Sequence, residues 1–558
     1  MFEAYFFDKH ADTVFRLFKL LKSLNGAPFT INKLSKQLEM SYQQTYNAYQ
    51  DVMVDLRQIQ TENAHQQTQA VQTGVMNSAL EAAPDADLVV TELSSVAPDY
   101  LAAKTDAAAE PATEMSFIDV AQNIHVDNYR FYLLNHSITF RFFDQVFQND
   151  GIDAAAFCRE NGISMSTLRR RIEPFRNFLQ NNRIQIDPGT WELHGGELVI
   201  RHLLVFFYDE GYRGAGWPFH CIDHDQILQQ FSVINAPANQ TLGIEHLSVI
   251  TKRNMLTLGV QMLRIKQGHY FAMNPRLQLL LRNFGDLADL VFTETYLPDC
   301  DERTRHAERN FYYCSRIGQI VMSTEDTPTS RQLREYLHSF SNPVDSFVTA
   351  LFANLTTGLD HPEELHLRAD KVLLTNLYKV AFLYYIMDGT FVKPSDFADT
   401  TDLFASAHEL IDQIDTFIAQ IPKADETHLF SRYQPDLVKS IFTVLIPDLA
   451  DFHTAPRLNV KLEMEAQSFI TKDMLNFLKD SSVIRIMNSD TQEVPDLIIT
   501  SVPNITGMYD NMNGHDSVDS GVPTFYWGSD NHDQDLYNLL KQLTMKAHAK
   551  AAAAPPQF

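Results

Sequence analysis

The sequence lacks the features that mark secreted, membrane-spanning and polyanion-wrapping proteins. Only four cysteines occur in 558 residues and none form a CxxC pair, so we expect no disulfide scaffold and a reducing compartment. The N-terminus has no secretory signal pattern, and apolar runs such as 380–387 are far shorter than the ~18 residues that cross a bilayer. Lys plus Arg number 45 against 70 Asp plus Glu, a net charge of −25 that still permits a local basic patch. We therefore expect a cytoplasmic protein without a membrane partner.

Motifs of common enzyme classes are also missing. Residues 190–558 contain no GxSxG, no Walker-type phosphate loop and no Cys–His pair that would carry a known reaction. No two histidines stand in an HExxH frame, so a zinc hydrolase has no support. We expect no enzymatic activity, no cofactor and no metal site.

Composition and hydrophobic periodicity divide the chain into several regions, as its length requires at roughly 100–200 residues per domain. One region stands apart, because residues 61–117 hold 13 Ala and nine acidic residues but one basic residue, Lys104. Such a stretch buries too little apolar surface to offset its ordering entropy, which predicts a flexible acidic insert. The predicted segments are 1–60, 61–117, 118–212, 213–325, 326–452, 453–547 and 548–558.

The last two segments differ from the helical middle of the chain. Within 453–547, short apolar runs alternate with amphipathic helical stretches, a pattern typical of a small α/β domain with a parallel sheet. The segment 548–558 is rich in Ala and Pro and is expected to be disordered. The predicted strands are 457–463, 483–487, 497–502 and 524–527.

A first helix-turn-helix is predicted between Thr30 and Leu56. Leu34 and Leu38 give a short helix its apolar face, and Ser41 with Gln44 forms the capping box of a second helix. The predicted buried stripe of that helix includes Tyr46. Short helix pairs with polar outer faces are common, so a DNA-binding role remains one of two interpretations. The predicted outward side chains, whose amides can pair with adenine, are Gln43, Gln44, Asn47 and Gln50.

A second helix-turn-helix has a stronger signal. Asp153 is expected to cap one helix, Gly162 to make the turn at a positive φ, and Ser164 to cap the next helix. Between residues 164 and 186 five arginines face one acidic residue, the reverse of the whole-chain charge. These side chains can bind phosphates or guanine edges, or they form a solvated face or pair with the acidic insert. The predicted DNA-binding residues here are Ser164, Ser166, Thr167, Arg169, Arg170, Arg171, Arg176 and Arg183.

Two further features belong to this second unit. Pro174 should kink the second helix or end it after Glu173, because proline lacks the amide N–H that a helix interior needs. The segments 183–187 and 191–193, joined by Pro188-Gly189, are predicted to form the two strands of a wing.

These residues resemble a known family. Ser164-Met-Ser-Thr-Leu-Arg169, followed by Leu193-His-Gly-Gly-Glu197 and Ile200-Arg201, resembles the helix-turn-helix signature of the Mga/AtxA-like transcriptional regulators. The resemblance implies a mainly α protein with two N-terminal winged helix-turn-helix domains, 1–60 and 118–212. It further implies two helical phosphotransferase regulation domains, 213–325 and 326–452, and a phosphotransferase IIB-like domain at 453–547.

The resemblance also implies regulation through histidine. In relatives the phosphotransferase system phosphorylates histidines of the regulation domains, and the added charge of roughly −1.5 to −2 can change helix packing. His246 is the first candidate here and His366 the second, and the alternative is that both are packing histidines. The C-terminal domain departs from an active IIB component, because Met464-Glu465-Ala466 follows its first strand where the phosphorylatable cysteine would stand.

The sequence thus predicts a DNA-binding transcriptional regulator, an activator, tuned by phosphorylation and oligomerisation. Its expected partners are double-stranded promoter DNA, a second copy of the chain, and phosphocarrier proteins of the phosphotransferase system. The alternative is a phosphotransferase-linked sensor or scaffold whose N-terminal helices bind protein and not DNA.

Overall fold

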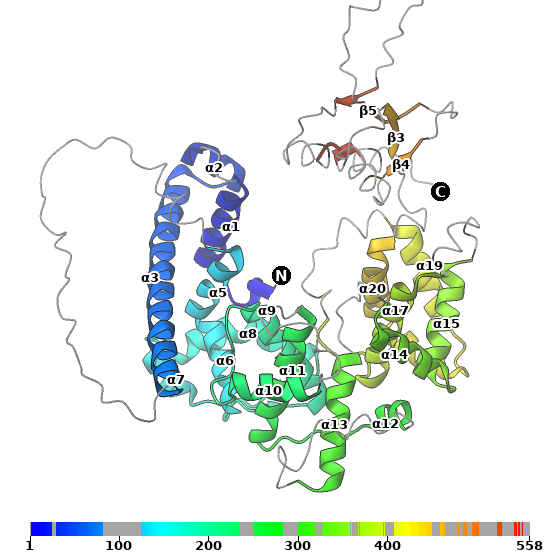
Figure 1. Cartoon of the computed structure of the whole chain (residues 1–558), viewed down its shortest axis with the longest axis horizontal. Coiled ribbons are helices and arrows are strands. Elements are labelled where there is room, and N and C mark those ends of the chain that lie inside the picture. Colours follow the sequence, from blue (N-terminus) through cyan, green and yellow to red (C-terminus); the bar gives the residue numbers. More distant parts are fainter. Residues whose placement is uncertain are drawn as a thin grey trace, which may run out of the picture. The chain divides into compact units, whose positions relative to one another are not determined.

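The structure is a computed structural model, and its chain divides into two compact units, Met1–Tyr270 and Phe271–Phe558 (Figure 1). The predicted boundary at 212/213 therefore lies inside the first unit. The residues that the structure describes are 2–24, 29–81, 124–234, 249–282, 300–317, 326–357, 359, 367, 369–393, 396, 407–448, 458–463, 478, 484–487, 494–500, 522–526, 539, 541–543, 545–546 and 550.

The first unit opens with a three-helix arrangement that contains the first predicted helix-turn-helix. Helices α1 and α2 both pack against α3, and α1 also contacts α5 (Figure 1). Leu34 and Leu38 are buried as predicted, and Glu39 turns the chain with φ +55, a left-handed conformation that few non-glycine residues adopt. The elements are η1 (Phe2–Tyr5), α1 (Lys9–Ser23), α2 (Ile31–Leu38) and α3 (Tyr42–Glu81).

Helix α3 corrects one prediction about the acidic insert. The helix continues to Glu81, so residues 61–81 are helical where the sequence predicted an irregular segment. Glycine and proline are the strong helix breakers, and this stretch contains one glycine and no proline, while Ala and Gln favour the helix. Residues 82–117 of the predicted insert lie outside the described residues. Among the described residues up to Glu81 there is no strand, so a wing of the first domain is not seen.

The second predicted helix-turn-helix follows in the same unit and confirms most of its predicted details. Helix α8 packs on both α6 and α7. The strands β1 and β2 pair antiparallel, Gln185 with His194 and Ile186 with Leu193, and form the predicted wing. The elements are α5 (Val126–His136), α6 (Ile138–Asn149), α7 (Ala154–Glu160), α8 (Met165–Asn181), β1 (Gln185–Ile186) and β2 (Leu193–His194), then α9 (Glu197–Tyr212), α10 (His224–Ile234) and α11 (Val249–Lys266).

Helix α8 does not end at Pro174. It continues to Asn181, so of the two predicted effects of Pro174, a kink or an end after Glu173, the end does not occur. Pro174 is exposed, which lets water satisfy the carbonyl that the missing N–H leaves without a helical partner. Phe175 and Leu179, both buried, hold the second half of the helix against the core.

The described elements of the second unit up to residue 448 are all helices. Its helix α17 is apolar on nearly all sides and contacts α14, α15 and α20, as expected for a core helix. The elements are α12 (Pro275–Leu281), α13 (Glu302–Ile317), α14 (Pro328–His338), α15 (Pro343–Leu355), α17 (Lys371–Ile386), α19 (His408–Ala419), η4 (Glu426–Tyr433) and α20 (Gln434–Leu445).

The C-terminal part contains the predicted parallel sheet. Its strand order is β4-β3-β5-β6, and all three neighbouring pairs are parallel. Leu458, Val460, Leu497 and Ile499 form its buried core with Leu539 and Leu543. Each predicted strand contains an observed one, β3 (Leu458–Glu463), β4 (Ile484–Ile486), β5 (Leu497–Thr500) and β6 (Thr524–Tyr526).

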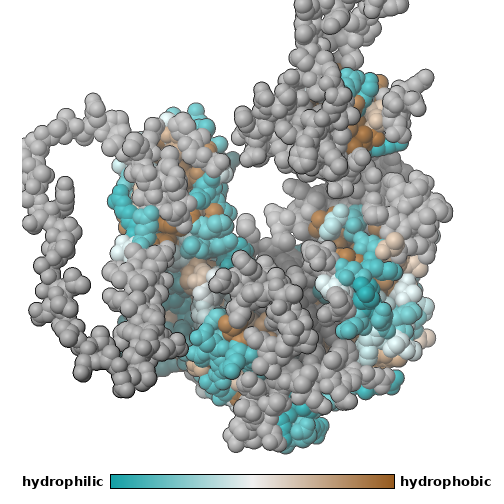
Figure 2. All heavy atoms as spheres, in the orientation of Figure 1, coloured by the Kyte–Doolittle hydropathy of each residue, from teal (hydrophilic) through white to brown (hydrophobic). Residues whose placement is uncertain are grey.

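The coloured surface in Figure 2 is mainly hydrophilic, with smaller apolar areas between polar ones. No helix within the described ranges has the length and apolar character needed to cross a membrane.

Candidate nucleic-acid interface

The N-terminus of α8 is organised by hydroxyl groups. Ser164 caps the helix, with its side chain accepting a 3.2 Å hydrogen bond from the Thr167 amide, after a turn in which Gly162 has φ +62. The Ser164 hydroxyl also lies 2.9 Å from the hydroxyls of Ser166 and Thr167. Ser164 therefore holds the start of the helix. Ser164 and Ser166 are both exposed, and Ser166 is the one that lies within the first turn.

Three consecutive arginines follow on the exposed surface of α8. Arg169, Arg170 and Arg171 are all exposed, and none forms an ion pair with a residue in the described part of the chain. Leu168 and Ile172, on either side of them, are fully buried. Arg170 is two residues from each, about 200° around the helix axis, so it projects directly away from the core. Arg169 and Arg171 project to its two sides.

The two remaining predicted arginines differ from these three. Arg176 is half-buried and forms a 2.7 Å ion pair with Glu173, one turn earlier on the same helix. That pairing reduces the positive charge which Arg176 can offer to a ligand. Arg183 is exposed just after the end of α8, at φ +56, and donates its amide to the Gln180 carbonyl.

The wing turns tightly but carries no basic residue at its tip. The Asp187 carboxylate accepts hydrogen bonds of 2.7 Å from the amides of both Gly189 and Thr190, which lower the pKa of Asp187. Residues 187–192 contain neither Lys nor Arg. Any binding of an anionic partner must therefore depend on α8 more than on the wing tip.

A buried charge network joins α9, the helix that follows the wing, to α11 and to the end of α6. Glu197 pairs with Arg201 at 2.8 Å and with Arg264 of α11 at 2.9 Å, and both arginines are almost fully buried. Arg264 also pairs with Asp150 at 3.2 Å, and His269 Nε2 lies 2.6 Å from the same carboxylate. Glu197 and Arg201 belong to the motif that carried the family resemblance, and the network gives these two residues a structural role.

The N-terminal turn η1 packs into the core of the second helix-turn-helix. Phe6 lies 4.9 Å from Phe175 of α8 and 5.8 Å from Phe207 of α9, measured between ring centroids. Glu3 pairs with the buried Arg130; burial alone would raise the pKa of Glu3, but the guanidinium outweighs it and lowers that pKa. Sequence analysis missed this contact, because nothing local in residues 2–7 indicates a partner 127 residues away.

The first helix-turn-helix presents a neutral face. Gln43, Asn47 and Gln50 are exposed as predicted, and Gln43 Nε2 donates a 2.8 Å hydrogen bond to Asn47 Oδ1. Gln44 is exposed but serves the capping box, since its Oε1 accepts from the Ser41 amide at 3.1 Å while Ser41 Oγ accepts from the Gln44 amide at 3.2 Å. The capping box predicted for Ser41 and Gln44 is therefore confirmed, and it engages the same Gln44 side chain that was also predicted to contact bases.

The predicted buried stripe of α3 needs one correction. Tyr49, Val52, Met53 and Leu56 are buried, but Tyr46 is 40% exposed. Tyr46 lies toward the start of the helix, and Thr45 and Ala48 take the buried positions around it.

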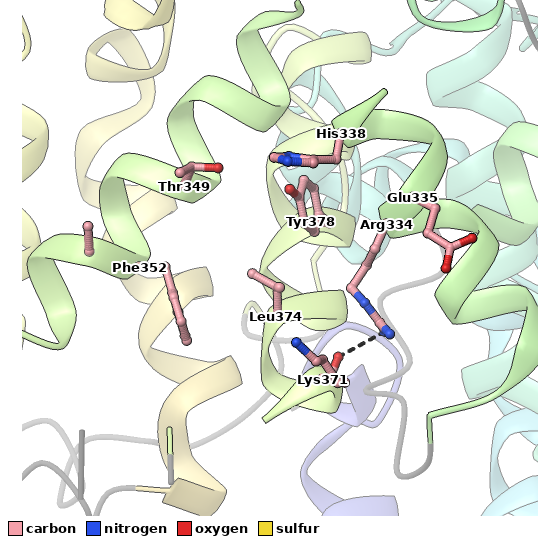
Figure 3. A pocket seen from close by; sticks show the side chains of 9 residues that line it. Arg334, Glu335, His338, Thr349, Phe352, Lys371, Leu374 and Tyr378 are labelled. Atoms are coloured by element: carbon pink, nitrogen blue, oxygen red, sulfur yellow. Dashed lines mark hydrogen bonds between the residues drawn. The ribbon is translucent and has the colours of Figure 1, made fainter. Parts of the chain in front are cut away.

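The second unit contains a pocket of about 390 Å³ between α14, α15 and α17 (Figure 3). Phe352 and Leu374 line its apolar wall, and His338 lies near Tyr378. Arg334, at another side, is engaged by the Lys371 carbonyl at 3.1 Å and by Asp326 at 2.8 Å. The lining is mainly apolar, and its buried cation already has protein partners.

The remaining predictions concern two histidines and a metal site. His246 and His366, the predicted phosphorylation sites, lie outside the described residues. Within the described ranges no cluster of three His, Cys, Asp or Glu side chains could hold a metal ion.

This chain is similar in sequence to known proteins. Residues 122–208 match the Mga helix-turn-helix domain. The capsule synthesis positive regulator AcpB of Bacillus anthracis is 23% identical over 155 residues, 28% of this chain and 31% of that protein. A protein of Streptococcus pneumoniae serotype 4, named as a trans-acting regulator, is 24% identical over 141 residues, 25% of this chain and 28% of that protein.

These matches span less than a third of either relative. Both relatives are named as regulators and neither as an enzyme. The chain carries an Mga helix-turn-helix domain, and its predicted resemblance to the Mga/AtxA-like regulators is confirmed.

Proposed function

We propose that this protein is a DNA-binding transcriptional regulator, an activator, that inserts α8 into the major groove of promoter DNA. The observation that carries the proposal is the set of three exposed arginines, without ion-pair partners in the described part of the chain, on the opening turns of a capped helix. In helix-turn-helix proteins the N-terminal residues of the second helix contact the base edges.

The directions of the three arginines suggest a division of roles. Arg170 points away from the core, toward the floor of a groove that receives the helix, where a guanidinium can grip guanine O6 and N7. Arg169 and Arg171 flank it by about 100° on each side and would face the phosphates of the two groove walls. The hydroxyl of Ser166, one turn before Arg170, lies on the same outward row.

The experiment that tests the proposal is a mobility shift of the full chain with random duplex DNA across a salt series. Each phosphate that a cation neutralises contributes a slope of about −0.9 to log K against log salt. Three to five contacts predict a loss of affinity of roughly 40- to 500-fold between about 50 and 200 mM salt. A folded protein that fails to retard DNA at the lowest salt would instead support the alternative function, a scaffold whose N-terminal helices bind protein.

We further propose that phosphorylation of His246 or His366 by the phosphotransferase system tunes self-association, with the C-terminal α/β domain contributing to the assembly. The support is the family resemblance and the size of the charge that a phosphoryl group adds. Aspartate at either position should change the sedimentation coefficient or the DNA affinity of the full chain. Alanine at the same position should change these two quantities less. Aspartate and alanine variants that all behave as wild type would exclude both histidines as the switch.

A further inference from the structure

Two tyrosines form an exposed pair at the start of α3. Tyr42 is 56% exposed and Tyr46 is 40% exposed, so both rings are accessible to a partner. Their rings are nearly parallel, with 6° between the planes and 6.5 Å between the centroids. They stand one helical turn apart, so both rings lie along the first two turns of the helix.

The tyrosines border the amide row of the same helix. Tyr46 is three residues after Gln43 and four before Gln50, so it neighbours both on the helix surface. Gln43 is already hydrogen-bonded to Asn47, which restricts the two amides to one arrangement. No residue from Ser41 to Gln50 is charged, in a chain where 21% of residues are. The exposed start of α3 therefore combines amides and aromatic rings without any charge.

This chemistry matches one kind of base pair. Adenine offers N7 and N6 in the major groove, which an Asn or Gln amide pairs with, and thymine offers a methyl group that needs an apolar contact. A face without cations attracts phosphates only weakly, but Lys33 and Lys36 are exposed on α2, the helix that crosses the backbone in this motif. We infer that the start of α3 reads A·T base pairs, with Tyr42 and Tyr46 against thymine methyl groups.

The inference rests on the proposed function and adds a second reading helix to it. Helix α8 would supply charge and affinity, whereas α3 would supply sequence preference with little contribution to the salt dependence. The alternative ligand for this face is a protein, which could be a second copy of the chain. The amide row favours DNA, because an interface core is usually formed by apolar and aromatic side chains without a row of exposed amides beside them.

The test uses a duplex selected from a random library by the full chain, synthesised again with deoxyuridine in place of thymidine at every position. Uracil lacks only the 5-methyl group, so the amide contacts to adenine remain. Wild type should bind the uracil duplex about fourfold more weakly for each thymine methyl that it contacts. A double variant Tyr42→Ala and Tyr46→Ala should bind the thymine and uracil duplexes equally.

Two controls separate the rings from other effects. The double variant Tyr42→Phe and Tyr46→Phe keeps both rings and should retain the discrimination, as should Val54→Ala, which shortens another exposed apolar side chain of α3. Equal binding of both duplexes by wild type, or discrimination that survives the alanine changes, would overturn the inference. An alanine variant that loses self-association but keeps the discrimination would assign the pair to a protein contact. If wild type retards no DNA at all, the proposed function fails with it.

Discussion

Asp144, half-buried on α6, accepts a 3.5 Å hydrogen bond from the Gln148 side chain. Burial raises the pKa of its carboxyl from 3.8 to about 6, although Gln148 and nearby His220 oppose the shift. Between pH 4 and 6 the folded protein therefore holds a proton that the unfolded chain has released. Stability from this group is greatest below about pH 4, falls as the pH rises to 6, and is constant above that.

Asp144→Asn should remove this pH dependence, because the amide cannot ionise. We expect the variant to be more stable than wild type at pH 7.5, by about 1–3 kcal/mol, and to be close to wild type near pH 4. Thermal or urea unfolding at both pH values measures the difference. Asp412→Asn, at an exposed site on α19, is the matched control and should change stability little at either pH. Equal effects of the Asp144 change at both pH values would contradict the assignment.

At the scale of single elements, the sequence predicted what local chemistry determines. Asp153 caps the start of α7, and Gly162 and Ser164 mark the turn between α7 and α8. These positions were predictable because cap hydrogen bonds and a positive φ depend only on neighbouring residues. The C-terminal strands were predictable for the same reason, since residues 457–463 alternate with period two and the other three strands are short apolar runs.

Elements that depend on distant contacts were not predictable. Helix α8 continues past Pro174 because Phe175 and Leu179 are packed against the core, and η1 finds its place on Phe175 and Phe207. For the candidate site, the sequence predicted the arginines of α8 and the amides of α3. It did not predict the exposure of Tyr46, because helical periodicity alone places this residue in the buried stripe.

At the scale of the whole molecule, a net charge of −25 repels DNA at long range. The proposed interface must therefore overcome this repulsion through a local positive surface, and Arg169, Arg170 and Arg171 are the residues that would provide it. A change that removes three positive charges anywhere raises the overall repulsion by the same amount. Only a change on α8 also removes the proposed contacts with DNA. Comparing an arginine variant of α8 with an equal arginine variant elsewhere therefore separates the loss of contacts from the change in net charge.

The most direct test replaces Arg169, Arg170 and Arg171 with alanine in the full chain and measures DNA affinity by mobility shift at low salt. The matched control replaces Arg303, Arg331 and Arg432, three exposed arginines of the second unit, and carries the same net charge. The account predicts that the α8 variant, folded by circular dichroism, binds at least about thirtyfold more weakly than wild type, while the control stays within a few-fold. Equal affinity of the two variants, whether both are strong or both are weak, would contradict it.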